Sequence, residues 1–215
     1  MDMLAGACWE PANERTATCL IVLCHGANAT GDAMARMVDV VAGLLPGAAF
    51  AAPHGPLASV SRPPMREWFS PPYAEPHIGP RVVAAAASLD AFIDAQLAAR
   101  GLPPDAYALV GFSQGAIVAL HAGLRRAVPP RAIVAVAGVA VTRDLPLAPI
   151  RPPVLLIAGT LDAVVPPRLV RETERMLRDA GVTIEAHYVA GLGHEVTPPV
   201  IALGGAFIQR VFRPR

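Results

Sequence analysis

The stretch Val110-Gly111-Phe112-Ser113-Gln114-Gly115-Ala116 (VGFSQGA) places a serine between two glycines directly after an apolar run. The preceding residues, ALVG, have the pattern of a buried strand, and the following residues, AIVALHAGL, that of a helix with an apolar inner face. A sharp strand-to-helix turn needs residues without a Cβ, and it leaves the serine hydroxyl projecting from the end of a sheet. The stretch therefore predicts a nucleophilic serine, provided that a base and an acid follow.

Continuous apolar runs of strand length recur along the chain, separated by stretches with helical spacing. Runs that are apolar on both faces are typical of strands buried in a parallel sheet. We expect strands at 19–24, 48–52, 107–111, 132–137, 154–158 and 183–189, and helices at about 32–45, 81–99, 114–126, 167–180 and 197–211. This alternation predicts an α/β fold, with a mostly parallel twisted sheet and helices on both faces.

Length and composition limit the classes of function. A chain of 215 residues can form one domain with a substantial core, so we expect a single domain over 1–215. The net charge of +1 offers no basic surface for nucleic acid. The histidines and cysteines lack metal-ligand spacing, and no phosphate loop or dinucleotide fingerprint is present, so we expect neither a metal nor a cofactor.

The sequence also bears on compartment and membrane. The stretch 106–124 carries no formal charge, but its glycines, Ser113, Gln114 and His121 argue against a transmembrane segment and favour a strand followed by a buried helix. The cysteines are odd in number, which argues against a disulfide framework, and the N-terminus lacks the features of a secretion signal. We therefore expect a cytoplasmic protein.

The region 53–80 holds eight prolines in 28 residues and cannot form a regular helix. We expect a long loop near the active site, packed against the body of the domain by its apolar side chains. We also expect apolar walls of a substrate pocket at Met65, Trp68, Phe69, Val164 and Val165. Anchoring of the loop to the core is the alternative role for Trp68 and Phe69.

A base and an acid that could serve Ser113 both follow it in the chain. His194 lies in a glycine-containing loop after the last strand, where its side chain can reach across the end of the sheet. Asp162 directly follows the apolar run VLLIAG, at the carboxyl end of a strand. Asp144 is a rival acid with a weaker strand context. The order Ser113, Asp162, His194 is the order found in α/β-hydrolases.

Acyl transfer also needs donors for the developing oxyanion, and backbone amides supply them without reorganisation. One donor is expected to be the amide of Gln114, immediately after the nucleophile. The other is expected from the loop HGANATGD, with Ala27 as the candidate. In the same loop we expect His25 to shape the backbone through hydrogen bonds.

Five motifs together resemble one family. They are LCHG (23–26), Arg66-x-Trp68-Phe69, GFSQGA (111–116), GTLDAVVP (159–166) and GLGHEV (191–196). The chain resembles the phospholipase/carboxylesterase family of α/β-hydrolases, which includes bacterial carboxylesterases and acyl-protein thioesterases. The resemblance implies an α/β-hydrolase fold and a cofactor-free serine esterase acting on small-molecule or lipid esters through an acyl-enzyme. Thioesters and lysophospholipids stay open as substrates, and a homodimer stays open as the assembly.

The sequence departs from the family at two positions, because Asn28 and Ala116 stand where relatives often have glycine. These departures bear on the shape of a loop and the size of the pocket. Two alternative functions stay open. A dienelactone-hydrolase-like lactonase usually has cysteine at the position of Ser113. A hydrolase-fold binding protein without turnover would be expected to lack a member of the triad, and none is missing.

Overall fold

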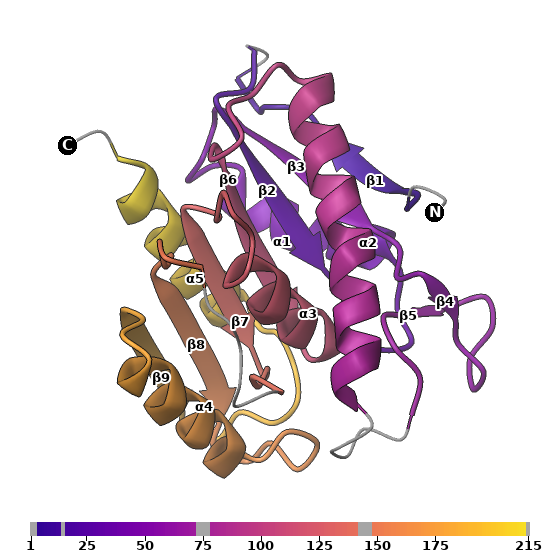
Figure 1. The fold of residues 1–215 in the computed structure, drawn as a ribbon, viewed down its shortest axis with the longest axis vertical. Coiled ribbons are helices and arrows are strands. Elements are labelled where there is room, and N and C mark those ends of the chain that lie inside the picture. The colour runs from indigo at the N-terminus through magenta and orange to yellow at the C-terminus, as the bar shows by residue number, and fades with distance from the viewer. Residues whose placement is uncertain (1–3, 14–15, 72–77, 142–147, 214–215) are drawn as a thin grey trace.

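Seven strands form the central sheet of the computed structural model, which describes residues 4–13, 16–71, 78–141 and 148–213 (Figure 1). Neighbouring strands from β3 to β9 run parallel, whereas β1 runs antiparallel to β3 at one edge. Across the sheet the order is β1 (Gly6–Trp9), β3 (Ala48–Pro53), β2 (Cys19–Cys24), β6 (Tyr107–Phe112), β7 (Ala132–Val136), β8 (Val154–Gly159) and β9 (Ile184–Val189).

The burial of the strands explains their continuous apolar sequences. Every residue of β2, β3, β7 and β8 is buried, as expected for parallel strands covered on both faces. The expected strands end within one residue of the observed ones, and the mostly parallel α/β sheet is confirmed. Strand β1 was not predicted. It has four residues, half of them exposed, so it carries no continuous apolar run.

Helices cover the two faces of the sheet in separate groups (Figure 1). One face carries α2 (Ile78–Ala99), α3 (Gln114–Gly123) and α4 (Pro167–Asp179), and the other carries α1 (Ala35–Val41) and α5 (Pro198–Phe212). A single 3-10 turn, Gly31–Met34, precedes α1. Helix α1 ends four residues before the expected end at residue 45, because the chain turns back toward β3 ahead of Pro46.

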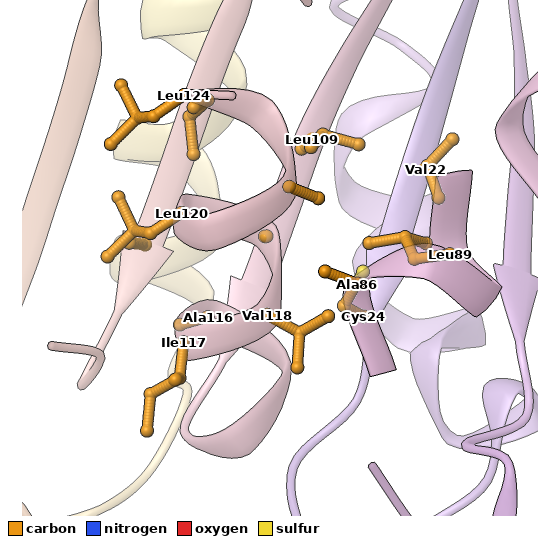
Figure 2. Close-up of a cluster of buried hydrophobic side chains, with 14 of the residues drawn as sticks. Val22, Cys24, Ala86, Leu89, Leu109, Ala116, Ile117, Val118, Leu120 and Leu124 are labelled. Atoms are coloured by element: carbon orange, nitrogen blue, oxygen red, sulfur yellow. The ribbon is translucent and has the colours of Figure 1, made fainter. Parts of the chain in front are cut away.

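Figure 2 shows part of the core between the sheet and the helices α2 and α3. Leu109 from β6, Leu89 from α2 and Leu120 from α3 belong to this cluster, and each is at most 1% exposed. Every residue of α3 is buried. The uncharged stretch 106–124 is therefore a buried strand followed by a buried helix, as the sequence indicated.

Among the described residues, only α2 is long and apolar enough to cross a membrane. Its side chains Val82, Leu89 and Ile93 are fully buried within the protein. These residues belong to the same core cluster as the strands β2 and β6. One side of α2 thus packs on the sheet.

The proline-rich region is more ordered than the predicted loop over 53–80. It contains a small hairpin formed by β4 (Leu57–Ala58) and β5 (Arg66–Glu67). Helix α2 begins at Ile78, inside the expected loop, because Pro80 falls in the first helical turn, where its missing N–H costs no helical hydrogen bond. The residues 72–77, which include His77, lie outside the described part of the chain.

Candidate active site

Ser113 occupies a sharp turn between β6 and α3. Its backbone has φ 54° and ψ −121°, a conformation that residues other than glycine rarely adopt. A Cβ on Gly115 would overlap the carbonyl oxygen of Cys24, and one on Gly111 would lie 2.5 Å from the backbone of Ala116. Both glycines are therefore required by close backbone approaches, and the turn presents Ser113 at the carboxyl end of the sheet.

The structure brings Ser113, His194 and Asp162 together. The Nε2 atom of His194 lies 3.1 Å from Ser113 Oγ, and its Nδ1 atom lies 2.8 Å from Asp162 Oδ2. The other oxygen of Asp162 accepts hydrogen bonds from the amides of Val164 and Val165, at 2.9 and 2.8 Å. The side chain of Asp162 is fully buried, whereas that of His194 is 20% exposed. With Nδ1–H donating to Asp162, a neutral His194 presents Nε2 as an acceptor to the serine hydroxyl.

Hydrogen bonds hold together the two loops that carry Asp162 and His194. The amide of Leu161 donates to the carbonyl of Leu192 at 2.9 Å, and Thr160 Oγ1 accepts from the amide of Gly191 at 3.0 Å. The ring of Phe112 lies under His194, with 4.8 Å between ring centroids. These contacts fix the imidazole on the same edge of the sheet as Ser113.

The two expected amide donors belong to residues beside Ser113. Ala27 and Gln114 both line the cavity into which Ser113 opens. Gln114 is the first residue of α3, so its N–H has no acceptor within the helix. Ala27 lies in the loop that follows β2. Both residues therefore lie beside Ser113, and their role as oxyanion donors stays a prediction.

The side chain of Gln114 has a structural role that sequence reasoning missed. It is 5% exposed, and its Oε1 accepts from the amide of Trp68 while its Nε2 donates to the carbonyl of Phe69, both at 3.0 Å. The glutamine thus joins the serine turn to the segment before α2. The G-x-S-x-G pattern could not reveal this, because it leaves the residue after the serine unspecified.

His25 lies under the loop that carries Ala27 and is fully buried. Its Nδ1 donates to the carbonyl of Gly26 at 2.7 Å, and its Nε2 accepts from the amide of Gly55 at 2.9 Å. Burial lowers the pKa of His25 to about 4, so the ring is neutral near pH 7. These contacts agree with the expected loop-shaping role.

A cavity of about 960 Å³ opens at Ser113 and is lined mainly by apolar side chains. Phe69, Val164 and Val165 line it as expected, but Met65 and Trp68 do not. Trp68 is 1% exposed, and its indole N–H donates to the carbonyl of His25 at 2.8 Å, so it anchors the segment to the core. Met65 belongs to the β4–β5 hairpin, where its backbone pairs with Ser59.

The far walls of the cavity were not predicted. They come from α3, from the loop after β7 and from one side of α4, and include Ile117, Val139, Ala140, Val141, Leu169, Thr173 and Met176. In the sequence, Leu169 and Met176 are not distinguished from their apolar neighbours Val170 and Leu177. These neighbours are core residues, each 1% exposed. Thr173 is buried, and its hydroxyl accepts from the amide of Ala140 at 3.1 Å, which ties α4 to the loop after β7.

The two departures from the family pattern have different surroundings. Asn28 has φ 58°, which explains why glycine suits this position in relatives. Ala116 is fully buried and does not line the cavity. A Cβ on Gly138 would overlap the methyl group of Ala116. The methyl group of Ala116 therefore packs against Gly138 and not into the cavity.

Two further expectations concern Asp144 and metals. Asp144, the rival acid, lies outside the described residues. Within the described part of the chain, no cluster of three or more histidine, cysteine, aspartate or glutamate side chains could hold a metal ion.

Comparison with known proteins places the chain in a family. The family model for phospholipase/carboxylesterase matches residues 10–211. The crystal structure of esterase PE8 is similar over 98% of this chain and 100% of that one, with 31% identity and a TM-score of 0.92. SOBER1 of Arabidopsis thaliana (24% identity, 92% and 100% covered, TM-score 0.80) and a carboxylesterase of Bacillus cereus (17%, 98% and 95%, 0.84) share the fold. The chain belongs to the phospholipase/carboxylesterase family of α/β-hydrolases, a family of esterases.

Proposed function

We propose that this protein is a serine carboxylesterase that hydrolyses carboxylic esters through an acyl-enzyme. The observation that carries the proposal is the position of His194, whose ring contacts Ser113 Oγ at 3.1 Å and Asp162 Oδ2 at 2.8 Å. A serine hydroxyl becomes an effective nucleophile when a base takes its proton, and a histidine held by a buried carboxylate is such a base.

In the first half-reaction, Ser113 Oγ attacks the ester carbonyl carbon while His194 Nε2 takes the hydroxyl proton. Asp162 stabilises the imidazolium and keeps Nδ1 protonated. The amides of Ala27 and Gln114 donate to the oxyanion of the tetrahedral intermediate. The intermediate collapses, the alcohol leaves with the proton from His194, and the acyl group remains on Ser113.

In the second half-reaction, His194 takes a proton from a water molecule, which attacks the acyl carbon. The same two amides stabilise the second tetrahedral intermediate. Collapse of this intermediate breaks the bond to Ser113 Oγ, which recovers its proton from His194. The products are a carboxylic acid and the free enzyme.

The apolar cavity supports a substrate with an apolar group beside the ester bond. Ile117, Val139 and Met176 offer aliphatic surface that an acyl or alcohol chain can cover. Thioesters and lysophospholipids would pass through the same acyl-enzyme, so they fall within the proposed chemistry. A reducing, cytoplasmic compartment suits the three cysteines, which are all free.

Turnover of p-nitrophenyl esters of increasing acyl length tests the proposal. Ser113→Ala should lower kcat by about four to six orders of magnitude. Ser88→Ala is the matched control, because Ser88 is a half-buried residue of α2 whose hydroxyl donates to the carbonyl of Ala84, and it should keep full activity. An inactive wild type on all esters and acyl-thioesters, or an active Ser113→Ala variant, contradicts the proposal.

The two alternative functions predict distinct results when dienelactones are assayed beside the p-nitrophenyl esters. A lactonase would hydrolyse dienelactones at rates well above those for open-chain esters. A binding protein would turn over neither class of substrate. The presence of serine at position 113 and the completed Ser113–His194–Asp162 contacts favour the esterase over both.

A further inference from the structure

Asn28 follows Ala27, one of the two proposed oxyanion donors. Its φ of 58° lies in the left-handed region, where glycine is free of strain and asparagine is tolerated. An asparagine at such a position carries a side chain that glycine lacks. The contacts of this side chain therefore indicate what the substitution contributes.

The side chain of Asn28 holds the β4–β5 hairpin. Its Oδ1 accepts hydrogen bonds from the hydroxyl groups of Ser59 and Ser61, the latter at 3.1 Å. Ser59 is 2% exposed and also accepts from the amide of Arg62 at 3.1 Å, so it is fixed within the hairpin. Asn28 is thus connected to an element that begins about 30 residues later in the chain.

Neighbouring contacts reinforce this connection at both ends of the hairpin segment. The amide of Arg66 donates to the carbonyl of Ala29 at 2.9 Å, directly after Asn28. Beyond β5, Gln114 holds Trp68 and Phe69 through its side-chain amide. The segment 59–69 is therefore bound at its first end by Asn28, the neighbour of Ala27, and at its last end by Gln114.

We propose that Asn28 is a positioning residue for the esterase reaction: by binding Ser59 and Ser61 it fixes the amide of Ala27 relative to that of Gln114. The inference rests on the proposed function. A preorganised oxyanion site loses much of its effect when a donor is displaced by a fraction of an ångström. Asn28 contributes to catalysis through the backbone of its neighbour and touches no reacting atom.

The clean variant is Asn28→Gly, because glycine adopts the same backbone conformation and only the two side-chain hydrogen bonds are lost. Loss of an oxyanion donor lowers kcat by about 10²- to 10³-fold, so a misplaced donor should lower it by about 10- to 100-fold. KM for p-nitrophenyl acetate should change by less than about threefold, because the ester is held mainly by the cavity walls.

Two further measurements separate positioning from loss of structure. Phenylboronic acid forms a tetrahedral adduct with an active-site serine, so its affinity should fall by the same factor as kcat. The combined variant Ser59→Ala/Ser61→Ala should reproduce the loss, and adding Asn28→Gly to it should cause no further loss, since the hydrogen bonds to Asn28 Oδ1 are already absent.

Ala137→Gly is the matched control, because Ala137 also has a positive φ, of 50°, and its replacement breaks no side-chain hydrogen bond. It should keep the wild-type kcat. The proposal is overturned if Asn28→Gly retains kcat within about twofold, if Ala137→Gly causes an equal loss, or if KM alone changes. An inactive wild type, or an active Ser113→Ala variant, would instead overturn the proposed function and this inference with it.

Discussion

One carboxylate oxygen of Asp162 is bonded to His194, and the other accepts hydrogen bonds from the backbone of its own loop. Oδ2 lies 2.8 Å from His194 Nδ1, while Oδ1 accepts from the amides of Val164 and Val165. The two backbone donors fix the rotation of the carboxylate, and the carboxylate fixes the imidazole. Each oxygen therefore has a separate function, which makes the site sensitive to the loss of either.

Asp162→Asn should lower kcat by about 10⁴-fold, as expected when the triad acid becomes an amide. The asparagine oxygen will face the two backbone N–H groups, so its NH₂ group will face His194 Nδ1. The ring must then accept at Nδ1 and carry its proton on Nε2, where it can no longer take the proton of Ser113. Steady-state kinetics test this, and a variant with more than about a tenth of wild-type kcat would contradict it.

Gln114→Leu should lower the free energy of unfolding by about 2–5 kcal/mol, because the buried hydrogen bonds from the amide of Trp68 and to the carbonyl of Phe69 are both lost. Urea denaturation measures the effect. Gln209→Leu is the control, since Gln209 makes one bond to the backbone, from its Nε2 to the carbonyl of Leu44 at 2.8 Å, and one to the exposed side chain of Arg213 at 3.3 Å. Equal losses in the two variants would argue against a special role for Gln114.

Gly115→Ala should destabilise the protein by about 3 kcal/mol or more, because the added methyl group overlaps the backbone of Cys24 and neither element can move away. Gly43→Ala introduces the same methyl group where nothing lies within 4 Å, and it should be tolerated. Thermal unfolding of both variants provides the comparison. A normal melting temperature for Gly115→Ala would show that the turn can relax.

Stability should fall as the pH is lowered from about 6.5 to about 4. Burial lowers the pKa of His25 and of His121 from 6.5 to about 4. Between these values the unfolded chain binds protons that the folded protein does not, so acid favours unfolding, and below pH 4 these two residues add nothing further. Each shift corresponds to a loss on the order of 3 kcal/mol.

His121→Gln isolates one of the two contributions. His121 lies on α3, is 5% exposed and contacts Arg125 through Nε2. The variant should show about half of the pH dependence over this window in urea denaturation series. An unchanged dependence would exclude His121 as a source.

Met176→Trp should restrict the cavity at the wall formed by α4. We expect kcat/KM for long acyl esters to fall by about tenfold or more, while that for acetate changes little, because only a long chain reaches this wall. Val83→Trp adds the same side chain at an exposed position of α2 and should leave the chain-length profile unchanged. Equal effects on short and long esters would place the apolar group elsewhere.

The sequence predicted the strands and helices that have a regular pattern of apolar residues. Apolar runs such as that of β8 identified buried strands, and Asp162 and His194 could be assigned because parallel strands bring their carboxyl ends to one edge of the sheet. The contacts between these side chains then followed from chain order and topology. The roles assigned to them remain proposals.

Features that depend on a few local contacts could not be predicted. Trp68 carries the same apolar signal whether it lines a pocket or anchors a segment, and only its bond to the carbonyl of His25 distinguishes the two. The β4–β5 hairpin has two residues in each strand, too few for an alternating pattern. On α4, Leu169 and Met176 line the cavity, whereas their neighbours Val170 and Leu177 belong to the core. The sequence pattern does not distinguish the two apolar faces.

The contact between Ala116 and Gly138 has a consequence for how relatives differ. A methyl group at one position excludes a methyl group at the other, so the pair accommodates a single methyl between the serine helix and the loop after β7. A relative with glycine at the first position has room for alanine at the second. Positions 116 and 138 should therefore vary in a reciprocal manner through evolution. The one methyl group between the two segments is conserved, while the position that carries it changes.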